Sequence, residues 1–402
     1  MTSMQAPYSS IELFVGAGGL AQGLARGGFH PRLVAEWNKD ACQTLRENQA
    51  RGFATVQHWP VAQEDVRNLS FESFEGIDLV SGGPPCQPFS IGGKHAGLSD
   101  TRDMFPQAVR AVRETQPRAF IFENVKGLTR PAFFNYFEYI RFQLQYPEIV
   151  QHADEAWTAH LGRLEQHHSS GDRSGLTYRV CTEVLQAADF GVPQKRERIF
   201  FVGFREDVGA EWSFPQATHS REQLLDAQYR TGEYWQRHEL EPPPSLPAKK
   251  VSKASLQKGP GLFSPETRAW RTVRDALQGL PDPCQDVHTK WENHLYVPGA
   301  RSYPGHTGSV LDAPSKTLKA GDHGVPGGEN MLLRPDGTVR YFTVRESARL
   351  QTFDDAYVFT GAWGEAMRQL GNAVPVALAE VVALSVAQSL RTLDAGRATL
   401  ST

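Results

Sequence analysis

One cysteine in this 402-residue chain has surroundings suited to covalent chemistry. Cys86 lies between Pro85 and Pro88, shortly after residues 77–81, an apolar run typical of a buried strand. Because proline lacks a backbone donor and fixes φ, this loop cannot simply continue as strand or helix. Open α/β sheets bind their ligands just past the carboxyl ends of such strands, so the thiol is placed for chemistry. The alternative is a proline turn with an incidental cysteine.

A carboxyl group is predicted at the same edge of the sheet. Residues 118–122 read as a second buried strand, and Glu123 follows directly. Adjacent parallel strands would bring the Cys86 thiol and the Glu123 carboxyl to one edge. A nucleophile and a proton donor or acceptor side by side suit covalent catalysis.

A glycine-rich turn predicts a binding site near the start of the chain. A predicted strand leads into residues 16–20, which hold three glycines, before a helix over 20–26. Glycines let a ligand approach the backbone, and the free N–H groups of a helix start bind its polar end. Glu36 follows Gly16 by 20 residues, the spacing at which an acidic side chain holds a ribose, and Trp37 offers a face for an adenine ring. A structural turn and a surface Glu-Trp pair are the alternatives.

The order of these features resembles a known family. Pro85 to Ser90, then Glu123 to Val125, then Gln194 to Arg198, resemble the C5-cytosine DNA methyltransferases, and the match runs through both ends of the chain. The resemblance implies an α/β fold, with a Rossmann-like S-adenosylmethionine-dependent methyltransferase domain and a smaller, loop-rich target-recognition domain. The glycine loop also lacks the GxGxxG spacing, which weakens a dehydrogenase interpretation.

The resemblance further implies a reaction on a flipped-out cytosine. The thiolate of Cys86 would add to C6 of the base, and the carboxyl of Glu123 would protonate N3 or form a strong hydrogen bond to it. Arg196 and Arg198 would orient Glu123 and the base. Because the target atom is inaccessible within a duplex, the nucleotide must leave the stack, and the glycine-containing segment 90–103 could close over it.

Two larger sets of residues would bind the cofactor and the DNA. The cofactor would be S-adenosylmethionine, released as S-adenosylhomocysteine, and no metal ion is expected. The predicted cofactor-binding residues are Phe14, Gly16, Gly18, Gly19, Leu20, Glu36, Trp37, Asp65, Val66, Pro85, Asn372, Ala373 and Val374. The predicted DNA-binding residues are Gln87, Ser90, Lys94 and Thr317.

Composition divides the chain into two predicted domains. The catalytic, cofactor-binding domain is expected at residues 1–204 plus 364–402. The target-recognition domain is expected at 205–363, where proline clusters begin and hydrophobic periodicity fades. Residues 127–176 exceed what the family requires and are predicted as an insertion.

Two local patterns predict structure rather than chemistry. Residues 167–172 are polar and are expected to form an exposed loop, so His160, His167 and His168 are not expected to bind metal. Thr343 with Glu346 three residues on is typical of a helix N-terminus.

Charge and cysteine content limit the partners. The net charge of -3 requires a nucleic-acid-binding protein to gather its Lys and Arg on one face. The four cysteines are far apart and form no CxxC pair, which argues against a structural zinc site or a disulfide framework. The polar amino terminus predicts no signal peptide, and we expect no apolar run as long as the roughly 20 residues of a membrane helix.

We therefore expect a soluble, cytoplasmic monomer, nucleoid-associated in a prokaryote. Its expected partner is double-stranded DNA, with no membrane. A cognate restriction endonuclease or another defence component would be a genetic rather than a physical partner.

Three other functions stay open. A tRNA cytosine methyltransferase would share the fold, although the long variable stretch from 205 to 340 favours DNA. A catalytically inactive relative would lack the nucleophile or the carboxyl, and both Cys86 and Glu123 are present. A thiol redox protein is disfavoured because no second cysteine lies near Cys86.

Overall fold

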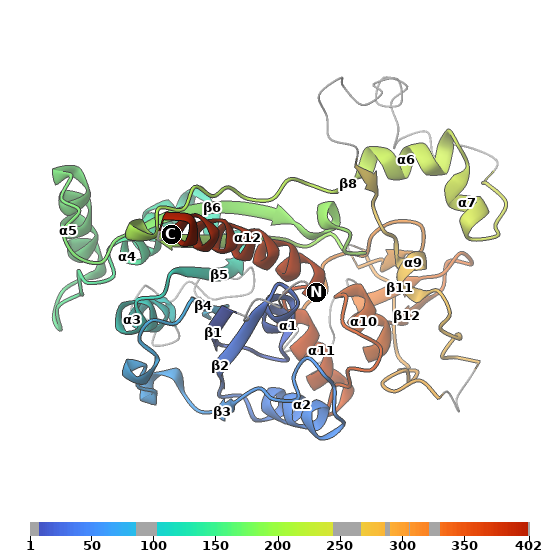
Figure 1. Ribbon diagram of the computed structural model, residues 1–402. Coiled ribbons are helices and arrows are strands. Elements are labelled where there is room, and N and C mark those ends of the chain that lie inside the picture. Colours follow the sequence, from blue (N-terminus) through green and yellow to red (C-terminus); the bar gives the residue numbers. More distant parts are fainter. Residues whose placement is uncertain are drawn as a thin grey trace. The chain divides into compact units, whose positions relative to one another are not determined.

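The chain forms two compact units. The computed structural model describes residues 8–85, 103–243, 267–285, 290–304, 306–320 and 330–400, with the backbone alone for 398–400 (Figure 1). The first unit comprises Met1–Leu185, Glu197–Pro215 and Ala379–Thr402, and the second Gln186–Arg196 and Gln216–Leu378. The predicted catalytic domain also included 186–196 and 364–378, which instead pack within the second unit. Residues 205–215, predicted in the target-recognition domain, pack within the first unit. The roles of the two domains stay predictions.

A seven-stranded sheet is the core of the first unit. Its order is β3-β2-β1-β4-β5-β7-β6. The strands from β3 to β5 in this order pair in parallel, whereas β7 runs antiparallel to β5. The apolar run from Ala119 to Phe122 is fully buried, as expected for a strand covered on both faces. The predicted α/β, Rossmann-like class is confirmed. The bounds are β1 Tyr8–Leu13, β2 Phe29–Glu36, β3 Val61–Gln63, β4 Leu79–Gly82, β5 Ala119–Val125, β6 Tyr178–Gln186 and β7 Glu197–Arg205.

Helices pack against these strands. Helix α1 contacts β2, α2 contacts β3, α3 contacts β4, and α4 contacts β7. At the centre of this core, the rings of Phe105 and Phe201 meet edge to face with their centroids 5.7 Å apart. The bounds are α1 Gly19–Arg26, α2 Lys39–Ala50, α3 Phe105–Thr115, α4 Phe134–Gln145, α5 Trp157–Ser170 and α12 Val376–Leu400.

The register of the parallel strands gathers the predicted site at one sheet edge. Leu13 of β1 pairs with Gly82 of β4, and Gly82 pairs with Phe122 of β5. The glycine loop, the turn toward Cys86 and Glu123 all follow directly after these paired residues.

The histidine-containing part of the predicted insertion is helical, so the expectation of a loop over 167–172 was wrong for its first part. Helix α5 continues to Ser170 and packs on α4 (Figure 1). His160 is buried, sharing a hydrogen bond of 2.9 Å with the Tyr139 hydroxyl and one of 2.7 Å with the Ile149 carbonyl. These tertiary partners stabilise a helix that the polar sequence alone did not indicate.

The last helical part of the chain is more apolar than expected. The helical stretch Trp363–Arg397 is long and apolar enough to cross a membrane by length and composition. The expectation that no such run exists was therefore wrong. Most of the stretch is buried inside the protein, including Val382, Val386 and Leu390, as in the core helix of a globular domain.

The second unit is rich in loops and short elements. Strands β10, β11 and β12 form a small sheet, and β8 pairs with β9. The strand bounds are β8 His219–Ser220, β9 Arg268–Ala269, β10 Ser309–Val310, β11 Met331–Leu333 and β12 Val339–Tyr341. The helices are α6 Arg221–Tyr229, α7 Glu233–Arg237, α9 Val273–Leu277, α10 Val344–Leu350 and α11 Trp363–Asn372.

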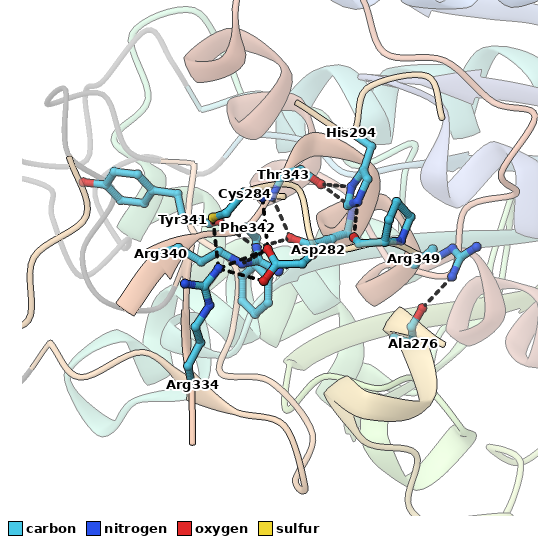
Figure 2. Close-up of polar contacts among 12 residues, drawn as sticks. Ala276, Asp282, Cys284, His294, Arg334, Arg340, Tyr341, Phe342, Thr343 and Arg349 are labelled. Atoms are coloured by element: carbon cyan, nitrogen blue, oxygen red, sulfur yellow. Dashed lines mark hydrogen bonds and ion pairs between the residues drawn. The ribbon is translucent and has the colours of Figure 1, made fainter. Parts of the chain in front are cut away.

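Polar side chains organise the start of α10. Thr343 and Glu346 form the predicted capping box, and Arg340 pairs with Glu346 at 2.6 Å in a buried position. Figure 2 shows the surrounding contacts, in which His294 bonds to the Thr343 hydroxyl at 2.9 Å and Arg334 to Asp282 at 3.0 Å. Such a network fixes loops that have little regular structure of their own.

Candidate active site

The turn after β1 is shaped by unusual backbone angles and a buried carboxylate. Phe14, Gly16 and Gly18 have φ of 54°, 56° and 86°, in the left-handed region that favours glycine. The Glu36 carboxylate accepts hydrogen bonds from the N–H groups of Gly16 and Asn38, both at 2.7 Å. The predicted glycine loop and the predicted acidic residue are therefore in direct contact.

This loop leaves room for a ligand. Among the residues that the structure describes, a Cβ atom placed on Gly16 would meet nothing within 4 Å. Glu36 is buried while the neighbouring Trp37 is 64% exposed. A carboxylate oxygen can accept more than one hydrogen bond, so the two backbone bonds of Glu36 do not by themselves exclude a ligand hydroxyl. Gly19 and Leu20, at the start of α1, are buried.

Asp65 and Val66 follow β3 at the same sheet edge. Gln63 of β3 pairs with Glu36 of β2, which places the residues after both strands together. Asp65 accepts a hydrogen bond from the N–H of Arg67 at 2.9 Å and pairs with its guanidinium, which lowers the pKa of Asp65. An adenine amino group would share Asp65 with Arg67, and this contact stays a prediction. Val66 is buried.

Two hydrogen bonds hold the carbonyls of Pro84 and Pro85, directly before Cys86. The Asn124 side-chain amide donates to the Pro84 carbonyl at 2.9 Å. The N–H of Met104 donates to the carbonyl of Pro85, an exposed residue, at 3.1 Å. The predicted residues Cys86, Gln87, Ser90 and Lys94, with most of segment 90–103, lie outside the described residues.

Glu123 and Arg198 form a buried ion pair beside this turn. Their Oε1 and Nε atoms are 2.7 Å apart, and the side chains are 8% and 11% exposed. A Cβ on Gly83 would lie 3.1 Å from Oε2 of Glu123, so the carboxylate sits at the root of the turn. Burial lowers the pKa of Arg198, while the Glu123 carboxylate acts in the opposite direction.

Arg196, predicted beside Arg198 at the base, belongs to the second unit. It is fully buried, and its guanidinium donates to the carbonyls of Leu318 at 3.0 Å and Gly371 at 2.6 Å. These bonds give Arg196 a role in holding main chain that the sequence did not predict.

The other predicted residues of the second unit also stay predictions as ligand contacts. The Thr317 hydroxyl donates to the Lys195 carbonyl at 2.6 Å, so it would have to leave that bond to donate to a phosphate. At the end of α11, Asn372 is exposed, Ala373 half-buried and Val374 buried.

One acidic residue near the site was not predicted. Glu12 of β1 is buried and accepts hydrogen bonds from the hydroxyls of Ser10, at 2.7 Å, and Ser81 of β4. Burial raises the pKa of Glu12 to about 7, against the effect of the two hydroxyls. Glu12 thus joins the two strands from which the glycine loop and the Cys86 turn emerge. A glutamate between Ile11 and Leu13 was the signal in the sequence.

The described cysteines of the first unit are poor nucleophiles. Cys42 is buried and donates to the Glu36 carbonyl at 3.2 Å, and burial raises the pKa of its thiol to about 11. Burial also raises the pKa of Cys181. Cys284 is exposed but lies in the second unit. Among the residues that the structure describes, no cluster of His, Cys, Asp and Glu is arranged to hold a metal ion.

The sequence matches the C-5 cytosine-specific DNA methylase family model over residues 8–146 and 172–388. The unmatched stretch is 147–171, which contains α5. The insertion predicted at 127–176 was therefore too long, because the family model also matches 127–146 and 172–176.

Individual relatives cover nearly the whole chain. It is 31% identical over 396 residues to the Type II methyltransferase M.PspPI of Psychrobacter sp. (strain TA137), covering 95% of this chain and 80% of that protein. It is 30% identical over 394 residues to the Type II methyltransferase M.NgoMIV of Neisseria gonorrhoeae, covering 96% and 98%. Among solved structures, the S. pombe Dnmt2 methyltransferase has the same fold, with a TM-score of 0.53 and 17% identity over 96% of this chain and 99% of that one.

Proposed function

Because the chain belongs to the C-5 cytosine-specific DNA methylase family, we propose that it methylates C5 of a flipped-out cytosine in a specific short duplex sequence, using S-adenosylmethionine. The chain is an enzyme, a DNA cytosine-C5 methyltransferase. The observation that supports Cys86 and Glu123 as the catalytic groups is the buried Glu123–Arg198 ion pair. The Glu123 carboxylate lies close to Gly83, which is three residues before Cys86.

In the proposed reaction, the Cys86 thiolate forms a bond to C6 of the cytosine, and the displaced π electrons make C5 nucleophilic. Glu123 delivers a proton to N3 as charge moves toward it, and Arg198 stabilises the carboxylate that remains. After methylation the C5 proton leaves to water. The electrons of the broken C5–H bond restore the ring double bond and expel the thiolate, and N3 returns its proton to Glu123.

The residues of the glycine loop fit the proposed cofactor. S-adenosylmethionine, when bound, supplies an electrophilic methyl group on a sulfonium. The open space at Gly16 admits a ligand close to the backbone, Glu36 can accept ribose hydroxyls, and the exposed Trp37 ring can stack on adenine. Asp65 is the proposed partner of the adenine amino group. Asn372 is proposed as a further cofactor contact.

The proposed partner is double-stranded DNA. Both relatives described above are named Type II methyltransferases, which supports a role in a restriction-modification system. In that role a cognate endonuclease would be a genetic partner rather than a bound subunit. We propose a cytoplasmic monomer.

The test is transfer of labelled methyl to mixed-sequence duplex DNA, followed by sequencing that distinguishes 5-methylcytosine. Wild-type protein and Cys284→Ser, which removes an exposed thiol of the second unit, should both label cytosine in one repeated short context. Cys86→Ser should label none. Label on tRNA and not on DNA would overturn the proposed substrate. Equal labelling by Cys86→Ser would overturn the proposed nucleophile.

A further inference from the structure

An irregular stretch of the second unit, residues 315–320, is held in place by the short segment 193–196. The two run parallel: the N–H of Ser315 donates to the Pro193 carbonyl at 2.9 Å, and the N–H of Lys195 donates to the Ser315 carbonyl at 2.8 Å. A single bridge of this kind fixes the register of the two segments without forming a sheet.

Two buried side chains of segment 193–196 extend this hold to Leu318. Gln194 accepts a hydrogen bond from the Leu318 N–H at 3.0 Å and donates to the Leu350 carbonyl at 3.3 Å. Arg196 donates to the Leu318 carbonyl at 3.0 Å and to the Gly371 carbonyl at 2.6 Å. The N–H and the carbonyl of Leu318 therefore both have hydrogen-bond partners, namely the fully buried side chains of Gln194 and Arg196.

Gly371 brings the end of α11 into the same junction. A Cβ on Gly371 would lie 2.3 Å from the nitrogen of Ala320 and 2.4 Å from the carbonyl carbon of Lys319, so only glycine fits this approach. The Gln351 amide donates to the neighbouring Leu370 carbonyl at 2.6 Å, so a second side chain also holds the helix end. We call Gln194, Arg196, Leu318 and Gly371 the junction.

Three lysines adjoin the junction: the Lys195 ammonium lies 5.7 Å from the centroid of the Trp270 ring, and the Lys316 ammonium donates to the Thr307 hydroxyl at 3.2 Å. Lys195 and Lys319 are exposed at positions next to its buried members, and Lys316 is half-buried in the same stretch. The backbone of Lys319 is fixed on both sides by Asn330, which accepts from its N–H at 3.0 Å and donates to its carbonyl at 2.9 Å. Lysines on a rigid backbone are suited to contact phosphates at a defined register.

We propose that Gln194 and Arg196 are positioning residues that lock stretch 315–320 to the end of α11, so that Lys195, Lys316 and Lys319 meet the DNA phosphates. This inference rests on the proposed methylation of duplex DNA. It replaces, for Arg196, a direct role at the base: its two donor bonds go to main-chain carbonyls, and its action on the reaction passes through the stretch that it holds.

Hydrogen–deuterium exchange of the full-length protein, without DNA or cofactor, tests the junction independently of activity. Arg196→Met should speed exchange in peptides covering both 315–320 and 367–374, and Gln194→Met should do so in the first. Lys319→Gln, which removes the charge of an exposed side chain and leaves both backbone bonds to Asn330 in place, should change neither. Unchanged exchange in both junction variants would overturn the proposal. If Arg196→Met does not fold, Gln194→Met alone provides the test.

Steady-state kinetics on duplex DNA test the consequence. Both junction variants should raise KM for DNA about tenfold with kcat within about threefold, because the proposed chemical groups lie in the first unit. Arg196→Lys keeps the positive charge but lacks the two guanidinium nitrogens that donate to Leu318 and Gly371, so its KM for DNA should be raised as in Arg196→Met. A variant with lost kcat, normal KM and normal exchange, rescued by lysine, would place Arg196 on the substrate instead. If the wild-type protein neither binds nor methylates DNA, the proposed function is refuted, while the exchange experiment still tests whether Gln194 and Arg196 hold stretch 315–320.

Discussion

Replacing Glu12 by glutamine should make the protein more stable at alkaline pH. In the folded protein the Glu12 carboxyl has a pKa of about 7, raised by burial from an ordinary value of 4.5. Between these pH values the unfolded chain has lost this proton and the folded protein keeps it, so unfolding releases a proton and rising pH favours the unfolded state. Glutamine has the same shape and does not ionise.

The expected effect follows from that interval. From pH 4.5 to pH 7, at about 1.4 kcal/mol per pH unit, wild-type protein loses about 3 kcal/mol of unfolding free energy relative to Glu12→Gln. This contribution is fully present below about pH 4.5 and is lost as pH rises to about 7. Because Glu12 is buried, solvent screening does not reduce it appreciably.

Urea unfolding of both proteins near pH 5 and near pH 8 measures the effect, since the difference between them cancels other titrating groups. From pH 5 to pH 8, the unfolding free energy of Glu12→Gln should rise relative to that of the wild type by most of the 3 kcal/mol. Glu72→Gln, which removes an exposed carboxylate, is the control. An equal difference between Glu12→Gln and wild type at both pH values would show that Glu12 is ionised in the folded protein and would refute the argument.

The remaining predictions concern the proposed site. Cys86→Ser should abolish methyl transfer and leave S-adenosylmethionine binding intact by calorimetry; measurable turnover would contradict its role as nucleophile. Glu123→Gln should lower kcat by roughly 10²–10⁴, because an amide cannot deliver the proton, and a kcat near wild type would exclude Glu123 as the acid. Arg198→Met leaves a buried carboxylate without its partner and should lower the unfolding free energy by about 3–5 kcal/mol in urea, and a loss below about 1 kcal/mol would mean that the pair is solvated. Trp37→Ala should weaken cofactor binding about tenfold with little change in stability, since the ring is exposed; unchanged affinity would remove Trp37 from the site.

The sheet and its functional edge could be predicted because they depend on local patterns. Apolar runs marked β1, β4 and β5, and the glycines after β1 have the left-handed angles that their residue type permits. The spacing of Gly16 and Glu36 predicted that both belong to one binding site, and the hydrogen bond between them places them together. Thr343 and Glu346 gave the start of α10 because a capping box lies within one helical turn.

Features that depend on tertiary partners could not be predicted. Helix α5 is stabilised by hydrogen bonds from His160 to Tyr139 and to Ile149, which lie 21 and 11 positions away in the sequence. The polar residues around His160 give no sign of these partners. Arg196 carries no local sign of its bonds to Leu318 and Gly371, 122 and 175 positions away. The buried environment of Glu12 arises only when β4 pairs with β1.

Trapping the covalent intermediate tests the central claim, that Cys86 attacks C6 of the target cytosine beside Glu123. In duplex DNA carrying 5-fluorocytosine within the methylated sequence, fluorine replaces the C5 proton, so the ring cannot expel the thiolate after methylation. Wild-type protein with S-adenosylmethionine should form a protein–DNA adduct that survives denaturation and maps to the peptide containing Cys86, while Cys86→Ser forms none. An adduct that maps to Cys42, Cys181 or Cys284, or methylation of unsubstituted DNA without any adduct on the substituted duplex, would contradict the account.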